Sequence, residues 1–466
     1  MKFAFTTNCK KYVLDTETPI SIYLKLREHF NQCILFEDTK ESLVPNRLSY
    51  ICFEPIAGIS INGFQITKSL PDGTRITEKI ISNNEVLPRL IDFLQIFLVT
   101  ADGGHRPGMF GYITYDSVRY FEDIDIPLNE LEAIPDIQYD LYRYTIVIDH
   151  LKSELSLVTL KREDEILANE PDIESIIKGN NLPVYPFKVT SKERNDCSSE
   201  VYLRNVEKGK LHCYKGDVFQ VVLSRLFEID FSGDDFNVYR ALRSVNPSPY
   251  MFYFDYNNFR LFGSSPEAQL KVSNGTASIH PIAGTYRRSG DDKKDTIAAQ
   301  QLKQDKKENA EHTMLVDLAR NDLSRHYQDV TLTEYRKTEQ YSHVIHMVSK
   351  VEGAHLIEQV HPLQILADTF PAGTLSGAPK HKAMNIIKKI EASQRGPYGG
   401  CIGFMAFDGT INKAIMIRSF LSKADTLYYR AGAGITAASV PENELEEINN
   451  KIDALRKALN IANTLQ

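Results

Sequence analysis

The sequence predicts an α+β protein built on antiparallel sheets. Strand-like runs rich in Val, Ile, Phe and Tyr follow one another along much of the chain, and helix-like runs with one apolar side separate them. Such an arrangement of strand runs and helix runs is typical of this class. The dipeptide Asn274-Gly275 lies between two strand-like runs and predicts a tight hairpin turn, which joins antiparallel neighbours.

The first part of the chain mixes helices with short strands. We expect a helix over 19–31 and strands over 50–63 and 142–150, because their apolar residues recur with the period of each structure. Residues 87–100 (LPRLIDFLQIFLVT) are too short and too often interrupted by polar residues to cross a membrane. We interpret them as a buried amphipathic helix.

A polar segment separates two regions. Residues 161–195 carry Gly, Asn and Pro between polar side chains, which predicts a surface linker. The N-terminal region then covers residues 1–160 and the C-terminal region covers residues 196–466.

The C-terminal region alternates between the two kinds of element. We expect a helix over 198–217, strands over 217–230, 250–256, 259–266 and 269–285, and a long helix over 291–325. The apolar side of the long helix is marked by Ile297, Leu302, Met314, Leu315 and Leu318.

Composition narrows the class of protein. The 466 residues carry a formal charge of -7, and Lys and Arg are interleaved with acids, which disfavours a nucleic-acid partner. The six Cys show no metal-ligand spacing, so reduced thiols are expected. The N-terminus lacks the apolar core of a signal peptide. We therefore expect a cytoplasmic protein with no membrane partner.

Two carboxylate doublets predict a metal site. Glu308 and Glu311 are three residues apart, as are Glu444 and Glu447. On a helix, this spacing places two carboxylates on one face, roughly 5–6 Å apart at Cβ. Oxygen ligands without Cys or paired His suit a hard cation such as Mg²⁺. On spacing alone, solvated faces of charged helices are an equally good interpretation.

Several runs between the doublets resemble a known family. They are PIAGT (281–285), DTFPAGTLSGAPKHKAM (368–384), GPYGGCIGF (396–404), AIMIRSF (414–420) and YRAGAGITAAS (429–439). Together they resemble the chorismate-utilising enzymes, and among these the anthranilate synthase component I branch. The resemblance implies large antiparallel sheets packed orthogonally and flanked by helices, with chorismate held between them.

The resemblance also implies roles for individual residues. Chorismate is a dicarboxylate, and its C4 hydroxyl must leave. Glu311 and Glu447 are the implied Mg²⁺ ligands, with Glu308 and Glu444 as outer partners. Glu267 is the implied general acid, and His346 is associated with the loss of pyruvate. The implied substrate contacts are Thr374, Gly284, Thr285, Tyr398, Arg418, Gly432, Ala433, Gly434 and Lys451.

The residue types suit these roles. A guanidinium fork such as that of Arg418 matches a carboxylate in two parallel hydrogen bonds, although a lone Arg is more often part of a surface ion pair. Glycines such as Gly432 let backbone N–H groups approach an anion. Burial beside other acids is expected to raise the pKa of Glu267 and keep it protonated. A lone His such as His346 is more often an ordinary core residue.

Two positions separate the branches of the family. Relatives that add water have a Lys where this chain has Gln220, and the folate-branch relatives have a Lys where it has Ala283. Ammonia is therefore the expected nucleophile, and a separate glutamine amidotransferase subunit is the expected source. Aminodeoxychorismate synthase component I and a catalytically silent binding relative are the alternatives.

The resemblance finally implies a regulatory site for tryptophan. It would be formed by Glu37 and Asp38 together with Pro249, Tyr250 and Met251. Asp38 departs from the family pattern, which has Ser there. Its carboxylate could bind the amino group of tryptophan or repel the carboxylate. We expect tryptophan to inhibit the enzyme.

Overall fold

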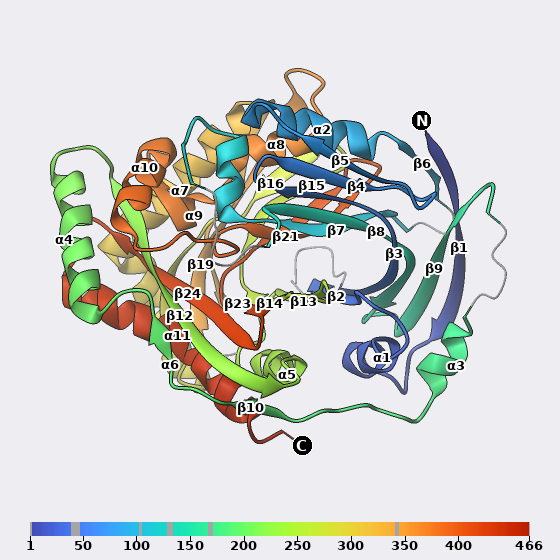
Figure 1. Ribbon diagram of the computed structural model, residues 1–466. Helices are drawn as coiled ribbons and strands as arrows, with labels where there is room; N and C mark the ends of the chain where they lie inside the picture. Colours follow the sequence, from blue (N-terminus) through green and yellow to red (C-terminus); the bar gives the residue numbers. More distant parts are fainter. Residues whose placement is uncertain are drawn as a thin grey trace.

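Figure 1 shows the computed structural model of the chain, which describes residues 2–38, 47–101, 105–127, 134–165, 171–340 and 344–465. The helices are α1 (Pro19–Leu26), α2 (Val86–Leu94), α3 (Ile173–Lys178), α4 (Ser199–Tyr214), α5 (Phe236–Val245), α6 (Asp292–Gln304), α7 (Lys306–Ser324), α8 (Pro362–Thr369), α9 (Gly373–Ser376), α10 (Lys380–Ile390) and α11 (Pro441–Ala462). Two short 3-10 helices span Asn83–Glu85 and Tyr115–Tyr120.

The strands of the first half are β1 (Phe3–Val13), β2 (Ile34–Asp38), β3 (Leu48–Asn62), β4 (Gln65–Ser69), β5 (Arg75–Lys79), β6 (Phe97–Thr100), β7 (Gly108–Ile113), β8 (Ile137–Asp149), β9 (Glu154–Arg162), β10 (Phe187–Val189), β11 (Arg194–Asn195) and β12 (Gln220–Gly233). Those of the second half are β13 (Tyr250–Asp255), β14 (Arg260–Ser265), β15 (Ala268–Ser273), β16 (Thr276–Ile279), β17 (Ile282–Arg287), β18 (Tyr327–Gln340), β19 (Val344–Leu356), β20 (Gly377–Ala378), β21 (Cys401–Ala406), β22 (Ile411–Ile415), β23 (Ser419–Lys423) and β24 (Thr426–Ile435).

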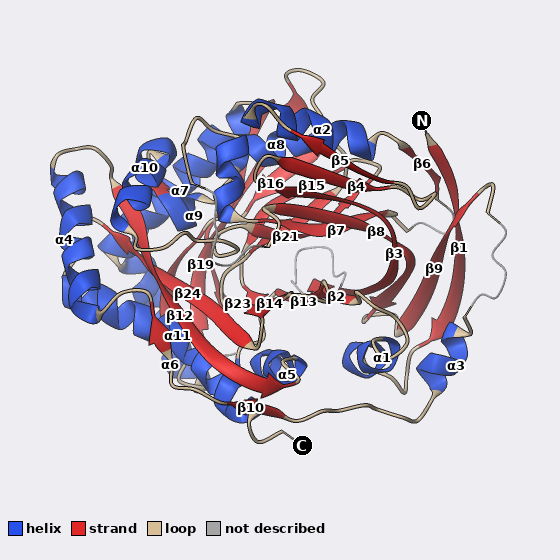
Figure 2. Cartoon of the chain, viewed as in Figure 1, coloured by secondary structure: helices blue, strands red, loops and turns tan. Residues whose placement is uncertain are grey.

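The strands form large antiparallel sheets that curve around the centre of the molecule (Figure 2). The helices α4, α7, α10 and α11 gather on one side of the strands, whereas α1 and α5 lie near β2 and β13 and are largely buried. Within the described ranges, the pairing of β1 with β6 is parallel and the others are antiparallel. The predicted fold class is thereby confirmed.

Strands from both regions of the chain pair with each other. β2 pairs with β13, and β7 pairs with β21. The rings of Tyr23 on α1 and Phe236 on α5 stack with their centroids 4.7 Å apart. The N-terminal and C-terminal regions therefore share sheets and a core, while the division at residues 161–195 stays a prediction.

Several predicted elements differ from those observed. The helix expected over 87–100 ends at Leu94, and β6 follows, because the tail of this apolar run pairs with β1 instead of extending the helix. The helix expected over 19–31 likewise ends at Leu26. The hairpin at Asn274-Gly275 is confirmed, since Ser273 pairs with Thr276 and both turn residues have positive φ.

The long helix expected over 291–325 is two helices. Asp305 ends α6 and caps α7, because its carboxylate accepts hydrogen bonds from the N–H groups of Lys307 (2.9 Å) and Glu308 (3.1 Å). Ile297, expected on the buried side, is 54% exposed. The break places Glu308 in the first turn of α7. Among the described residues, no helix is long and apolar enough to span a membrane.

Candidate active site

The two carboxylate doublets lie on α7 and α11, as the spacing predicts. On α7, Glu311 accepts a hydrogen bond from the side-chain amide of Gln220 at 3.0 Å. On α11, Glu447 lies 2.6 Å from the ammonium of Lys451, which also donates to the carbonyl of Gly432 at 2.8 Å. Lys451 therefore links the second doublet to β24.

The acids of the two helices act on one another. Burial raises the pKa of Glu308, and the charges of Glu311 and of Glu447 on the other helix raise it further. Burial and the charge of Glu447 likewise raise the pKa of Glu444. Crowded carboxylates of this kind attract a cation, because each one destabilises the charge of its neighbours.

The donor chemistry fits Mg²⁺, although the side chains do not converge on one point. Within the described part of the chain, no group of three or more His, Cys, Asp or Glu is arranged to hold an ion. Instead, Glu447 faces Lys451 and Glu311 faces Gln220. Rotation of these side chains would be needed to surround a cation, so the metal site stays a prediction.

Glu267 and Thr374 lie together in the C-terminal half of the chain. Thr374, in the first turn of α9, donates to both carboxylate oxygens of Glu267 at 3.2 Å. Glu267 is 8% exposed and lies in the turn between β14 and β15. The pair holds a buried carboxylate in a fixed position, which a proton-transfer group requires.

His346 faces the PIAGT segment on the neighbouring strand. Its Nδ1 lies 3.2 Å from the carbonyl of Gly284, and β17 and β19 pair with Thr285 opposite His346. Burial first, and then the charge of Arg418, lower the pKa of His346 to about 4. The ring is therefore neutral near pH 7. Since a carbonyl can only accept, Nδ1 carries the proton and Nε2 is the basic nitrogen.

Two further predicted substrate contacts, Arg418 and Thr285, lie near His346. Arg418 has a left-handed backbone (φ 49°), and its carbonyl accepts from the N–H of Ser264 at 3.1 Å. The charge of Arg418 contributes to the low pKa of the His346 ring, so the two side chains lie near each other. The side chain of Thr285 lies outside the described part of the structure.

The glycines of β24 make room for side chains. A Cβ at Gly434 would lie 2.1 Å from the amide nitrogen of Gln220, and one at Gly432 would lie 2.9 Å from the hydroxyl of Tyr398. Ala433, between them, is buried. These close approaches explain the glycines without a ligand, and backbone binding of an anion stays a prediction. A neighbouring side chain also explains Gly284, because a Cβ there would lie 3.1 Å from Glu308 Oε2.

A buried ion pair that the sequence does not predict lies near Tyr398. Glu391 accepts from Arg395 Nε at 2.9 Å and from the backbone N–H of Ser224 at 2.7 Å. The Arg395 guanidinium lies 5.8 Å from the Tyr398 ring centroid and donates to the carbonyl of Leu375 next to Thr374. In sequence, Glu391 and Arg395 look like an ordinary i, i+4 surface pair, and no other signal marks them.

The residues predicted for tryptophan binding also come together. In the pairing of β2 with β13, Asp38 lies opposite Tyr250 and Glu37 lies opposite Met251. Glu37 is buried and accepts from Tyr239 (2.7 Å) and Arg243 (3.0 Å). This pairing brings the two segments together although more than 200 residues separate them in sequence. Pro249 directly precedes β13.

A cavity of about 590 Å³ opens beside Asp38. Its lining includes Tyr50, Lys271, Phe404 and Asn412. Lys271 lies 3.1 Å from the Asp38 carboxylate, and Asn412 donates to it at 2.8 Å. The charge that distinguishes Asp38 from a Ser is therefore balanced within the protein.

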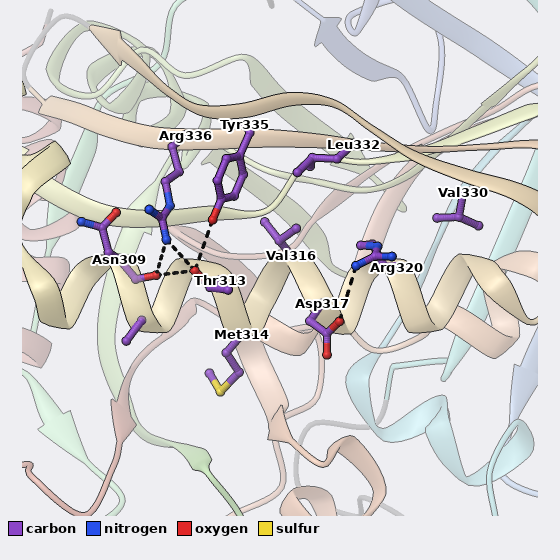
Figure 3. A pocket seen from close by; sticks show the side chains of 11 residues that line it. Asn309, Thr313, Met314, Val316, Asp317, Arg320, Val330, Leu332, Tyr335 and Arg336 are labelled. Carbon is purple, nitrogen blue, oxygen red and sulfur yellow. Dashed lines mark hydrogen bonds and ion pairs between the residues drawn. The ribbon is translucent and has the colours of Figure 1, made fainter.

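A second cleft, of about 690 Å³, lies between α7 and β18 (Figure 3). Arg336 crosses it and donates to Thr313 at 2.7 Å. Its lining comes from α7, including Asn309 and Thr313, and from β18, including Leu332 and Tyr335. None of the predicted site residues lines this cleft, so we do not assign the chemistry to it.

Comparison with known proteins places the chain in a family. The sequence pattern of the family described as chorismate binding enzyme matches residues 33–457. The chain belongs to this family, as its motifs predict. Anthranilate synthase component 1 of Thermus thermophilus is 38% identical over 466 residues and covers 97% of each chain. That of Acetivibrio thermocellus is 35% identical, covering 97% of this chain and 94% of its own.

Solved structures agree with the sequence comparison. Anthranilate synthase component I from Streptococcus pneumoniae superposes with a TM-score of 0.75 at 29% identity, covering 89% of this chain and 93% of its own. The menaquinone-specific isochorismate synthase MenF of Escherichia coli gives a TM-score of 0.73 at 17% identity, covering 98% and 95%. The latter shows the fold alone.

Proposed function

We propose that the protein converts chorismate and ammonia to anthranilate and pyruvate, as the Mg²⁺-dependent lyase subunit of a synthase for tryptophan biosynthesis. The observation that carries this proposal is the hydrogen bond from Gln220 to Glu311. A neutral amide stands at the position that the water-adding relatives fill with a basic Lys. Water therefore has no base there to deprotonate it, whereas neutral ammonia is nucleophilic enough to attack without first losing a proton. The names of the relatives support the same reaction.

The residues of the site suit two successive steps. Arg418 would pair with a carboxylate of chorismate, and Glu267 would give a proton to the C4 oxygen as it leaves. The neutral Nε2 of His346 would then take the C2 proton as the enolpyruvyl group departs as pyruvate. Glu311 and Glu447, with Glu308 and Glu444 outside them, would hold a Mg²⁺ ion that stabilises charge on the ring carboxylate.

The proposal includes a separate amidotransferase subunit in the cytoplasm. A cysteine nucleophile needs an accessible thiolate, but burial raises the pKa of the Cys401 thiol in β21 to about 12. A thiol of that kind does not hydrolyse glutamine. Ammonia would therefore come from a partner.

Purified protein incubated with chorismate, Mg²⁺ and ammonium at alkaline pH should form fluorescent anthranilate. Glutamine alone should give none, because free ammonia and not glutamine is the expected nucleophile. Accumulation of aminodeoxychorismate without anthranilate would favour the folate-branch alternative, and unchanged chorismate would favour a silent relative. Anthranilate formed from glutamine by this chain alone would refute the separate subunit.

Substituting His346→Met should slow the loss of pyruvate roughly 10²–10⁴-fold while amination continues, because it removes the only basic group assigned to that step. An aminated, non-aromatic intermediate should accumulate and can be followed by chromatography and mass spectrometry. His355→Met, at an exposed position on the same strand, is the control. Equal slowing of both steps would contradict this role.

Tryptophan should inhibit the enzyme by binding in the cavity beside Asp38. Lys271 offsets the charge of Asp38 and would donate hydrogen bonds to the carboxylate of an amino acid, while Asp38 would accept hydrogen bonds from its ammonium group. Because the chain contains no Trp, any indole fluorescence after equilibrium dialysis comes from the ligand. Lys271→Met should weaken retention roughly tenfold.

The control for this experiment is Lys68→Met, which removes another ion-paired strand lysine outside the cavity. If dialysis retains no tryptophan and millimolar tryptophan leaves the rate unchanged, the regulatory proposal is wrong.

A further inference from the structure

A small cavity of about 30 Å³ adjoins Glu267 and Thr374. Its other walls come from β15, α7 and α9, including Gln269, Leu315 and Leu318. A water-sized molecule needs at least about 10–15 Å³ of such space. The cavity therefore has room for one or two small molecules and for nothing larger.

A β-bulge turns Gln269 toward this cavity. In the pairing of β15 with β22, Ala268 lies opposite Ala414 and Leu270 lies opposite the next residue, Lys413. Gln269 is thus the extra residue, and a bulge re-aims the side chain that it carries. The side chain of Gln269 is only 2% exposed. A buried position in a regular strand does not require a polar residue.

The Gln269 amide has a fixed orientation. Its Nε2 donates to the carbonyl of Thr369 at 3.1 Å, and Lys380 donates to the same carbonyl at 2.9 Å. Because a carbonyl can only accept, the nitrogen must face Thr369 and the oxygen must point the other way. That oxygen is buried and, among the described residues, receives no hydrogen bond. Other buried side-chain atoms of the described residues also lack a hydrogen-bond partner, but Gln269 Oε1 belongs to a residue that lines this cavity.

We infer that this cavity receives the water molecule released from C4 of chorismate, with Gln269 Oε1 as its acceptor. This inference rests on the proposed function. Glu267 gives its proton to the C4 oxygen, and the C4–O bond breaks with its electron pair going to oxygen. The nitrogen lone pair of ammonia forms the bond to C2 as the ring double bonds shift.

The resulting water donates one hydrogen to Gln269 Oε1 and one to the Glu267 carboxylate. The extra proton on the new ammonium group returns to Glu267 through solvent. Holding the water keeps the leaving group away from the ring, so that the reaction proceeds forward. Gln269 is a positioning residue in this scheme, because it acts on the departing water and not on the ring.

Ammonia is the other small donor that the cavity could hold. The position of the cavity favours water, because the cavity adjoins Glu267, which is assigned to the leaving oxygen. Gln220, on β12, does not line the cavity and lies beside Glu311. Water and ammonia in this cavity would have different effects on the kinetic constants. A water site affects kcat, whereas an ammonia site affects the KM for ammonium.

Gln269→Leu tests the inference, because Leu has nearly the same volume but no acceptor. We expect kcat with saturating ammonium to fall roughly tenfold, with the KM values for chorismate and ammonium unchanged. A crystal structure of the unsubstituted protein should show a water within hydrogen-bonding distance of Gln269 Oε1, and that of the variant should not. Gln138→Leu, which removes a partly buried strand amide far along the chain, is the control.

Gln269→Asn provides a second variant if Leu disturbs folding, because it withdraws the oxygen by one methylene and stays polar. An empty cavity in the unsubstituted protein, an unchanged kcat in both variants, or a raised KM for ammonium with kcat preserved would each overturn the inference. If the unsubstituted protein makes no anthranilate, the proposed function fails instead, whatever the cavity contains.

Discussion

Substituting Glu311→Gln should reduce the turnover of chorismate with ammonium roughly 10²–10³-fold while the fold survives. Gln preserves the shape of the side chain and removes its charge, so a hard cation loses an anionic ligand. The hydrogen bond from Gln220 also loses its charged acceptor. Glu447→Gln should have a similar effect, since it removes the matching charge on α11.

Mg²⁺ binding can be measured independently of turnover by isothermal titration calorimetry. The heat of Mg²⁺ binding should be lost in Glu311→Gln and preserved in Glu446→Gln, which alters an exposed acid on α11 beside Glu447. Near-normal turnover and Mg²⁺ binding in Glu311→Gln would show that the doublets are not the metal site.

Local patterns predicted the class of the fold and its strongest turn. The hairpin at Asn274-Gly275 is determined by the φ preferences of two residues, so it can be read without tertiary information. The end of α2 at Leu94 could not be predicted in this way, because it depends on the pairing of residues 97–100 with β1. The break at Asp305 had a visible signal, since an Asp three residues before a Glu in a helical run is a typical N-cap.

The residues of the candidate site likewise divide into those that local sequence indicates and those that depend on tertiary contacts. Glu267, His346 and Arg418 could be proposed because motif resemblance carries tertiary information that spacing lacks, and their roles stay predictions. Gln269 was not found, because its position in a bulge depends on the register between β15 and β22. Ligand binding at Gly434 stays a prediction, but the atom nearest to its missing Cβ belongs to Gln220. Sequence alone could not name that neighbour.

Substituting Glu391→Gln should lower the free energy of unfolding by about 3 kcal/mol. The change leaves Arg395 (3% exposed) without its buried counter-ion and weakens the charge balance of Arg430, whose guanidinium lies 3.9 Å from Glu391. Because Arg395 also contacts the Tyr398 ring and the carbonyl of Leu375, kcat/KM for chorismate should fall as well. Urea denaturation should show a lower midpoint with an unchanged slope.

The difference in free energy of unfolding between the unsubstituted protein and Glu391→Gln should be larger near pH 7 than in acid. Burial alone would raise the pKa of Glu391, but the charge of Arg395 and the hydrogen bonds to it lower the pKa below its ordinary value. The stabilisation by a carboxylate with a depressed pKa is complete above the unfolded pKa, at about 4.3, and is lost as the pH falls through the folded value. The unsubstituted protein and the variant should therefore differ fully near pH 7 and converge in stronger acid.

The control for the stability measurement is Glu174→Gln, which breaks an exposed i, i+4 pair with Lys178 on α3. Solvent screens that pair, so the midpoint should not move measurably. The two pairs have the same spacing in sequence, but the side chains of Glu391 and Arg395 are buried and those of Glu174 and Lys178 are exposed. Equal midpoints for Glu391→Gln and the unsubstituted protein, or a difference that grows as the pH falls from 7 to 3, would contradict a stabilising buried ion pair beneath the site.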